Sequence, residues 1–195
     1  GANIGYVTLL LATGLCAARV LAIEPQDSVR ALLSRSIEYN NLHSIITVDS
    51  RALWDITGAE LSLHVPGALL GSTTITGPPF GVTEFTGSQR VTTVTLDDLL
   101  GELAIERVDF IKLDLEGSEA RAWRGMRRTW ERNSDLVMCA EYFTSPEGPE
   151  LLEELRASGA RIQRVDDEGD VVDLAEQGVA PYTMLWISHG QHHTG

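Results

Sequence analysis

The sequence predicts an α/β protein with a doubly wound, mostly parallel sheet and an antiparallel strand at its C-terminal end. Short apolar segments with the period of a strand alternate with amphipathic segments of helical period, which is typical of βαβ units. The chain has 195 residues, of which 43% are hydrophobic and 22% charged, enough for one globular domain with a core. We therefore expect one domain over residues 1–188 and a C-terminal tail over residues 189–195.

The first part of the chain alternates helices with strands. Apolar periodicity predicts helices over Tyr6–Leu15 and Asp27–Asn40, and short strands over Arg19–Ile23 and Ile45–Val48. The opening segment, Gly1–Gly5, has the pattern of a strand-to-helix turn, but the strand that should come before it is missing. A parallel sheet without its first, central strand would expose unpaired backbone groups. We therefore expect the numbered domain to be N-terminally incomplete.

The middle of the chain carries a predicted hairpin and a loop. Two alternating runs, Ala59–Val65 and Ser72–Thr76, are joined through Pro66 and Gly67, which predicts an antiparallel pair. The segment Gly77–Arg90 is rich in glycine, proline and threonine. It is a candidate lid or acceptor-binding element, and simple surface disorder is an equal alternative.

The remaining elements complete the alternation of helices and strands. Thr95 is placed to be the N-cap of the helix Thr95–Leu103, and Gly159 is placed to end the helix Pro149–Ala157. The predicted helices are Thr95–Leu103, Ser118–Trp130 and Pro149–Ala157, and the predicted strands are Val108–Leu115, Leu136–Glu141, Arg161–Val165 and Thr183–Ser188.

Composition excludes several classes of partner. A net charge of −13 argues against binding nucleic acid through its phosphates, and an arginine cluster within residues 121–132 fits a solvated helix face. No apolar run is long enough to cross a membrane, and no signal peptide is visible. The two cysteines, Cys16 and Cys139, lie in apolar segments, which favours buried free thiols and a cytoplasmic location.

The opening turn and one acidic residue predict a nucleoside site. Gly1 and Gly5 allow a ligand to approach the backbone closely, and Glu24 ends a short strand nineteen residues after Gly5. A carboxylate at that spacing is placed to accept hydrogen bonds from ribose hydroxyls. Asn3 stands where a dinucleotide-binding turn has its middle glycine, which favours S-adenosylmethionine over NAD. Ordinary turn glycines and an exposed strand end are the alternative interpretation.

The strand Val108–Leu115 carries the second candidate group. Its alternation places Phe110, Lys112 and Asp114 on one face. Lys112 is the only lysine, and in an apolar strand it needs a carboxylate partner, for which Asp114, Glu116 and Glu141 are candidates. A structural ion pair is the favoured interpretation for Lys112, whereas Asp114 ends a strand at the edge where α/β sheets bind ligands.

Several segments together resemble the FkbM family of methyltransferases, in that family's order. They are GANIGYVTLLLA, VLAIEP, TVDSRALWD, TLDD and VDFIKLDLEGSE, and they fall within residues 1–141. The resemblance implies a Rossmann-like fold of the class I methyltransferases, S-adenosyl-L-methionine as donor, and O-methylation of a sugar or polyketide-type natural product. It makes Gly1, Asn3, Gly5 and Glu24 cofactor contacts, and it places Ser50, Arg51 and Ala52 beside the adenine.

The expected reaction needs a proton acceptor and an aligned small-molecule acceptor. Asp114 is the first candidate for the base, followed by Glu141 and Glu116, with Lys112 beside them. No Cys/His spacing predicts a metal site, although Asp114 and Glu141 could share a cation with the substrate. The alternatives are an NAD(P)-dependent oxidoreductase and a non-catalytic interaction domain, and the oligomeric state is left open.

The histidines are weaker candidates. His64 could act as a base, although a solvent-facing strand residue is the favoured interpretation. His189, His192 and His193 could bind a transition metal, although a disordered tail is favoured for them.

Overall fold

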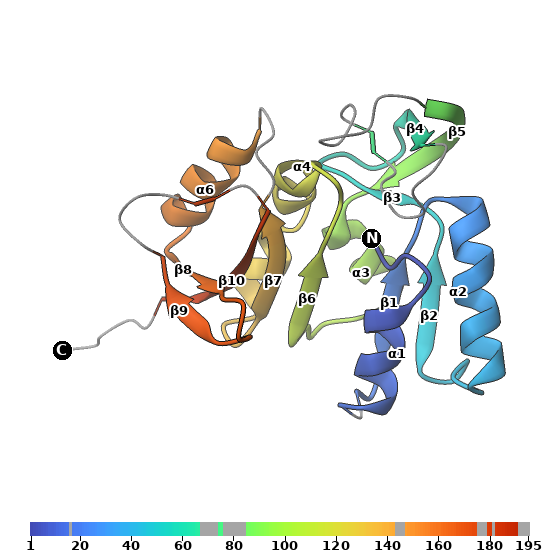
Figure 1. Ribbon diagram of the computed structural model, residues 1–195, viewed down its shortest axis with the longest axis horizontal. Coiled ribbons are helices and arrows are strands. Elements are labelled where there is room, and N and C mark those ends of the chain that lie inside the picture. Colours follow the sequence, from blue (N-terminus) through green and yellow to red (C-terminus); the bar gives the residue numbers. More distant parts are fainter. Residues whose placement is uncertain are drawn as a thin grey trace. The chain divides into compact units, whose positions relative to one another are not determined.

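The computed structural model describes residues 1–15, 17–66, 74–75, 85–142, 147–174, 179–180 and 182–190. The chain divides into two compact units, Gly1–Val94 and Thr95–Gly195. Both units contain helices and strands, and their sheets include parallel and antiparallel pairs (Figure 1). The α/β class predicted from the sequence is therefore confirmed.

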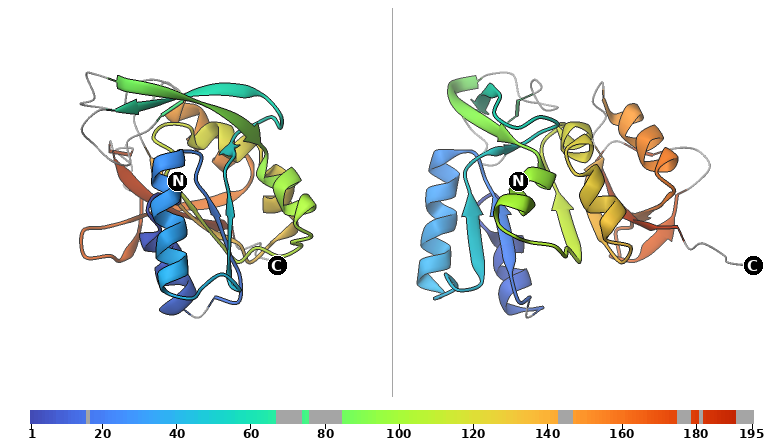
Figure 2. Two further views of the ribbon diagram at one scale, coloured as in Figure 1. Left: turned by 90° about the vertical axis from the view of Figure 1, so that its right-hand side faces the viewer. Right: turned by 180° about the vertical axis from the view of Figure 1, so that it is seen from behind.

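The first unit begins with two helices and two parallel strands. They are α1 (Tyr6–Thr13), β1 (Val20–Ile23), α2 (Asp27–Tyr39) and β2 (Ile46–Asp49). All four lie where the apolar periodicity predicts them. Figures 1 and 2 show α2 alongside this two-stranded sheet. Apolar residues of α2, among them Leu33 and Ile37, are buried with Val20, Ala22 and Ile46 of the strands, and this packing forms one hydrophobic core of the unit.

A three-stranded sheet completes the first unit. Its strands are β3 (Ala52–Leu53), β4 (Glu60–Pro66) and β5 (Phe85–Val94), in the order β3-β5-β4. β5 runs parallel to β3 and antiparallel to β4, with Leu63 opposite Gln89.

β4 has a second partner that was not predicted, because it pairs with β5 along its length. Of the predicted partner Ser72–Thr76, only Thr74 and Ile75 are described, and Thr74 forms an antiparallel bridge with His64 of β4, as the predicted pair requires. The predicted loop Gly77–Arg90 is wrong over its last residues, which belong to β5, while residues 77–84 lie outside the described part of the chain. The sequence of β5 is mostly Thr, Ser, Gly, Gln and Arg before Val91, so its strand character comes from pairing with β4 rather than from apolar alternation.

The second unit is built on a five-stranded sheet in the order β6-β7-β10-β8-β9. The strands are β6 (Phe110–Leu113), β7 (Val137–Tyr142), β8 (Ala160–Val165), β9 (Val171–Asp173) and β10 (Thr183–His189). The helices are α3 (Leu96–Glu102), α4 (Glu119–Arg124), α5 (Arg127–Arg132) and α6 (Gly148–Ala157). The predicted N-cap of α3 is confirmed, because the Thr95 hydroxyl accepts a hydrogen bond from the Asp98 N–H.

Strand direction in this sheet changes at β10. β6 and β7 are parallel, whereas β10 runs antiparallel to both of its neighbours, β7 and β8, which confirms the predicted antiparallel C-terminal strand. Among the described strands of the two units, three pairings are parallel and four are antiparallel. The sheets are therefore mixed, and less parallel than expected. The short strand β9, which pairs with β8, was not predicted.

Two predicted elements of the second unit have different bounds. The predicted helix Ser118–Trp130 is two helices, because α4 ends at the C-cap Gly125 and the chain leaves helical geometry at Met126, where φ is −128°. Glycine weakens a helix interior, which explains a break at this position. The predicted strand Val108–Leu115 is shorter, because its pairing with β7 covers only Phe110–Leu113.

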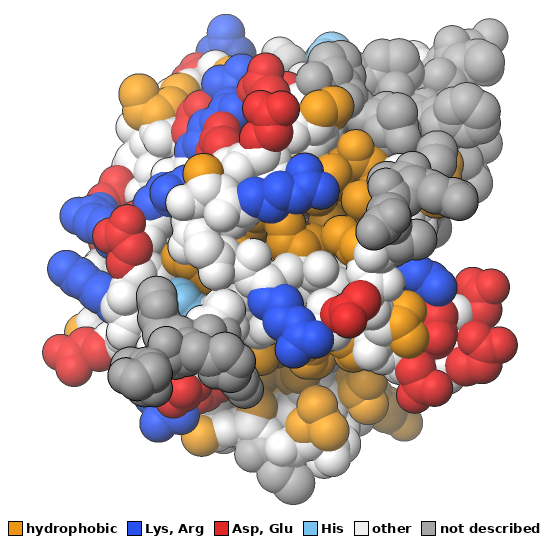
Figure 3. Space-filling view, turned by 90° about the vertical axis from the view of Figure 1, so that its left-hand side faces the viewer, with side chains coloured by type: hydrophobic (Ala, Val, Ile, Leu, Met, Phe, Trp, Pro, Cys, Tyr) orange, Lys and Arg blue, Asp and Glu red, His pale blue; other side chains and the backbone are white. Residues whose placement is uncertain are grey.

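The arginine cluster of α4 and α5 makes ion pairs. Arg124 contacts Glu150 and Glu154 of α6, each at 2.7 Å, and Arg121 contacts Glu147 at 3.0 Å. Arg127 lies over the ring of Trp123, 5.0 Å from its centroid. On the face seen in Figure 3, basic and acidic side chains are likewise intermixed.

Within the described residues, no helix combines the length and the apolar character that crossing a membrane requires.

Candidate functional site

The turn at Gly1–Gly5 is fixed to the end of β1. The Ala2 N–H donates to the Ile23 carbonyl at 2.9 Å. Asn3 and Gly5 both adopt left-handed backbone conformations, with φ of 53° and 99°. Asparagine and glycine are the residues that tolerate this region best. Gly5 is also the N-cap of α1, so the turn leads directly into the helix.

Glu24 faces this turn. Its side chain is buried, with the residue only 5% exposed. One carboxylate oxygen accepts a hydrogen bond from the Asn3 N–H at 2.8 Å, and the other accepts one from the Gln26 N–H at 3.0 Å. These two backbone donors hold the buried carboxylate in a fixed position. We call Gly1–Gly5 together with Glu24 the glycine turn site.

Gly5 has a second role, in the packing of α1 against α2. A Cβ atom at this position would lie 2.6 Å from Cδ1 of Leu33, which is completely buried. The sequence interpretation assigned Gly5 to close approach of a ligand. The structure gives it two further reasons to be glycine, its positive φ and its contact with Leu33.

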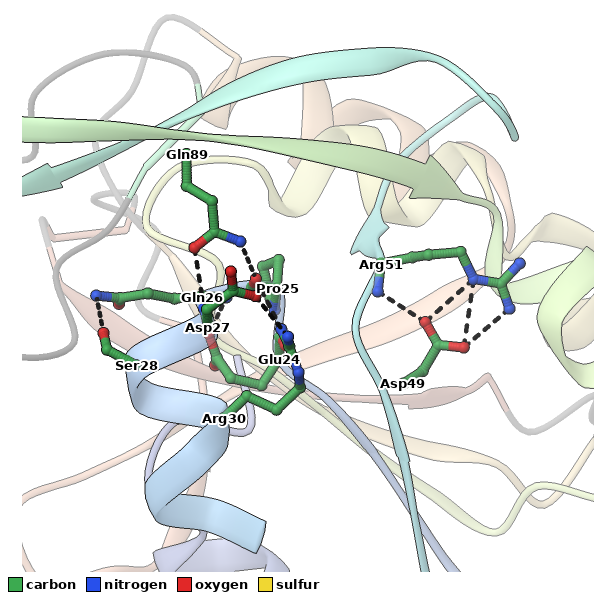
Figure 4. A network of polar contacts seen from close by, with 9 residues as sticks. All are labelled: Glu24, Pro25, Gln26, Asp27, Ser28, Arg30, Asp49, Arg51 and Gln89. Carbon is green, nitrogen blue, oxygen red and sulfur yellow. Dashed lines mark hydrogen bonds and ion pairs between the residues drawn. The ribbon is translucent and has the colours of Figure 1, made fainter.

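The ends of β1 and β2 lie side by side. The Glu24 N–H donates to the Asp49 carbonyl at 3.0 Å. The Asp49 carboxylate then receives the Arg51 guanidinium, with Nη2 to Oδ2 at 2.8 Å, and also the Arg51 N–H at 2.8 Å (Figure 4). Burial raises the pKa of Asp49, but the hydrogen bonds from Arg51 outweigh it and hold that pKa below its ordinary value. Ser50 is exposed and Ala52 is buried in β3.

Gln89 of β5 lies beside the glycine turn site, although no sequence pattern indicated it. Its Oε1 accepts from the Asp27 N–H at 2.9 Å, and its Nε2 donates to the Pro25 carbonyl at 2.8 Å. Arg30 donates to the same Pro25 carbonyl at 2.9 Å and to the Glu24 carbonyl at 3.1 Å. Figure 4 shows Gln89 reaching from β5 to the turn that follows Glu24.

The second group of predicted residues lies in the second unit, at the ends of β6 and β7. Lys112 is opposite Cys139 in the parallel register, and its Nζ contacts Asp114 Oδ2 at 2.5 Å. The predicted ion pair of the only lysine is therefore present, with Asp114 as its partner. Asp114 and Glu141 share a hydrogen bond. We call Lys112, Asp114, Glu116 and Glu141 the carboxylate cluster.

Protons are unevenly distributed over this cluster. Burial raises the pKa of Asp114, but the hydrogen bond and charge of Lys112 outweigh it, so its pKa is below the ordinary value. Burial and the charge of Asp114 raise the pKa of Glu141 to about 7, and they do the same for Glu116, together with the charge of Glu119. The cluster thus combines one carboxyl group whose pKa is lowered with two whose pKa lies near neutral pH.

Glu119 shapes the turn that carries Glu116. It is buried, and its carboxylate accepts hydrogen bonds from the Leu115 N–H at 2.7 Å and the Gly117 N–H at 3.1 Å. Glu116 and Gly117 both have positive φ, of 52° and 98°. Glu119, the first residue of α4, thus holds the turn that precedes the helix.

The other candidate residues lie outside these two groups. His64 is half-buried in β4 and contacts the ring of Phe85, with the centroids 5.2 Å apart. His189 belongs to β10 and stacks on Trp130 at 3.9 Å, while His192 and His193 lie outside the described residues. In the part of the chain that the structure describes, no group of three or more His, Cys, Asp or Glu side chains could hold a metal ion.

Comparison with known proteins identifies one family. The model of the methyltransferase FkbM domain matches residues 1–162 of the 195-residue chain. No curated protein and no solved structure gives a match. The matched range contains both the glycine turn site and the carboxylate cluster.

Proposed function

We propose, from the premise that the chain belongs to the FkbM methyltransferase family, that it is an S-adenosylmethionine-dependent O-methyltransferase. Its substrate would be a hydroxyl group of a small molecule, such as a sugar or a polyketide-type natural product. The observation that carries the proposal is the buried Glu24 carboxylate, which faces a turn with left-handed backbone at Asn3 and Gly5.

The glycine turn site fits an adenosine-containing donor. Each Glu24 oxygen accepts one backbone N–H, at Asn3 or Gln26, and each carboxylate oxygen has about two lone-pair sites. The remaining sites can accept from the two ribose hydroxyls. In the same proposal, Gly1, Asn3 and Gly5 contact the donor, and Ser50, Arg51 and Ala52 flank its adenine.

A Rossmann-like arrangement is part of the proposal. Two features support it, the parallel β1-α2-β2 crossover of the first unit and the position of β10 between β7 and β8 in the second. In open α/β sheets, ligands bind beyond the carboxyl ends of the strands. Glu24, Asp49, Asp114 and Glu141 all stand at or just after such ends.

The carboxylate cluster would supply the base. S-adenosylmethionine, when bound, supplies a methyl group that its sulfonium makes electrophilic. The acceptor oxygen would take this methyl group as its carbon–sulfur bond breaks, and a carboxylate of the cluster would take the hydroxyl proton. A base works best with a pKa near the working pH, which favours Glu141 at about 7 over Asp114. Asp114, held by Lys112, would orient Glu141 through their shared hydrogen bond.

Isothermal titration calorimetry tests the donor. We expect S-adenosylmethionine and S-adenosylhomocysteine to bind and NAD(P) not to bind. Glu24→Gln should weaken binding about tenfold or more, since a hydrogen bond to a charged group contributes about 1.5–3 kcal/mol and about 1.4 kcal/mol is tenfold. Binding of NAD(P) in place of the methyl donor, or no binding of either sulfur compound, would refute the proposed donor.

A further inference from the structure

We propose that Gln89 is a positioning residue for the nucleoside site, acting through Glu24. This inference rests on the proposed function, because the ligand it concerns is the adenosine of the methyl donor. Gln89 is in β5, more than sixty residues from the glycine turn, yet its side-chain amide makes both of its described hydrogen bonds to the segment that follows Glu24.

The first step concerns the start of α2. The first N–H groups of a helix have no intrahelical acceptor and need a cap. Gln26 occupies the N-cap position, but its side chain makes no capping hydrogen bond. Gln89 supplies the missing acceptor, because its Oε1 lies 2.9 Å from the Asp27 nitrogen. α2 is thus capped by a residue from another sheet.

The second step concerns Pro25. Its carbonyl receives Gln89 Nε2 at 2.8 Å and Arg30 at 2.9 Å, so one acceptor is held from β5 and from α2 at once. Pro25 directly follows Glu24, and Gln26 donates its N–H to the Glu24 carboxylate at 3.0 Å. Fixing Pro25 and Asp27 therefore fixes the Gln26 amide between them, which in turn orients the Glu24 carboxylate.

The consequence is a specific link between β5 and ligand affinity. If the two hydrogen bonds of Gln89 are lost, the Gln26 N–H and the Glu24 carboxylate gain freedom that ligand binding must remove again. Such pre-organisation affects the affinity for the donor without any direct contact. When these two hydrogen bonds are lost, the Gln26 amide proton should also exchange faster.

The test compares two substitutions on β5. Gln89→Met keeps the length of the side chain and removes both hydrogen bonds. Thr93→Val is the matched control, because Thr93 also makes two hydrogen bonds, accepting from Ala59 N–H at 3.0 Å and donating to the Ile56 carbonyl at 2.6 Å. We expect Gln89→Met to weaken S-adenosylhomocysteine binding about fivefold to tenfold, equivalent to about 1–1.4 kcal/mol. Thr93→Val should lower the melting temperature and leave the Kd unchanged.

A double-mutant cycle shows whether Gln89 acts through Glu24. In a Glu24→Gln background, Gln89→Met should change the Kd less than twofold. With Glu24 intact, Gln89→Glu, which keeps the acceptor for the Asp27 N–H, should weaken binding less than Gln89→Met does. Full additivity of the two substitutions, or equal Kd effects of Gln89→Met and Thr93→Val, would overturn the inference. Hydrogen exchange at the amides of residues 26–30 separates failure of this inference from failure of the proposed function, because exchange should accelerate in Gln89→Met even if no donor binds. Unchanged exchange would also overturn the inference.

Discussion

Substituting Gly5 by alanine is expected to destabilise the protein by about 2–5 kcal/mol. Two costs add at this position. A residue with a Cβ in the left-handed region costs about 1–2 kcal/mol. The new Cβ would lie 2.6 Å from Cδ1 of Leu33. Leu33 is fully buried in the apolar cluster between α2 and the strands β1 and β2, so its side chain has little room to move. Overpacking of this kind costs about 1–3 kcal/mol.

Gly58 provides the matched control for this prediction. It also has a positive φ, of 86°, but a Cβ there would meet nothing within 4 Å. Gly58→Ala should therefore cost only the backbone part, about 1–2 kcal/mol. Urea unfolding followed by circular dichroism gives both values from the shift in midpoint. Equal destabilisation by the two substitutions would show that contact with Leu33 does not restrict position 5.

Three further predictions concern the second unit. The pKa of Glu116 and of Glu141 is about 7 in the folded state, against an ordinary glutamate value of 4.5. The folded state therefore binds more protons between these two pH values, so the free energy of unfolding should fall as pH rises from about 4.5 to about 7. Glu116→Gln should flatten this decline in urea titrations at pH 5 and pH 8, and an unchanged slope would contradict the assigned pKa. Asp97→Ala should cost about 1–3 kcal/mol, since its carboxylate accepts from the Thr129 N–H at 2.7 Å and the Arg128 N–H at 3.0 Å. Its less buried neighbour Asp98, which pairs with Arg128 at 3.1 Å, is the control. Asp98→Ala should cost less than about 1 kcal/mol, and equal losses would show that the Asp97 bonds add nothing.

Local sequence signals predicted much of the fold. The spacing between Gly5 and Glu24 correctly places a carboxylate against the opening turn, because a short strand and its preceding helix leave few alternatives for that distance. Thr95 is a cap because its hydroxyl and the Asp98 N–H are three residues apart. Both features depend on residues that are close in the sequence, so local patterns were enough to predict them.

Long-range pairing could not be predicted in the same way. β5 is polar over most of its length, and its pairing with β4 and β3 makes it a strand. Gln89 contacts Pro25 and Asp27 across more than sixty residues, and nothing in its own neighbourhood indicates this. The pKa of Glu141 likewise depends on Asp114 of another strand, so the order of preference among the candidate bases could not come from the sequence.

The central claim is that the Glu24 carboxylate holds the ribose of an adenosine. Its most direct test is calorimetry with S-adenosylhomocysteine analogues in which the ribose 2′- or 3′-hydroxyl is replaced by hydrogen. The account predicts that either analogue binds the wild-type chain about tenfold or more weakly than the parent compound, as expected for the loss of a hydrogen bond to a charged group. In Glu24→Gln the parent and the analogues should differ by much less. Equal affinity of wild type for the parent and both analogues would contradict the account.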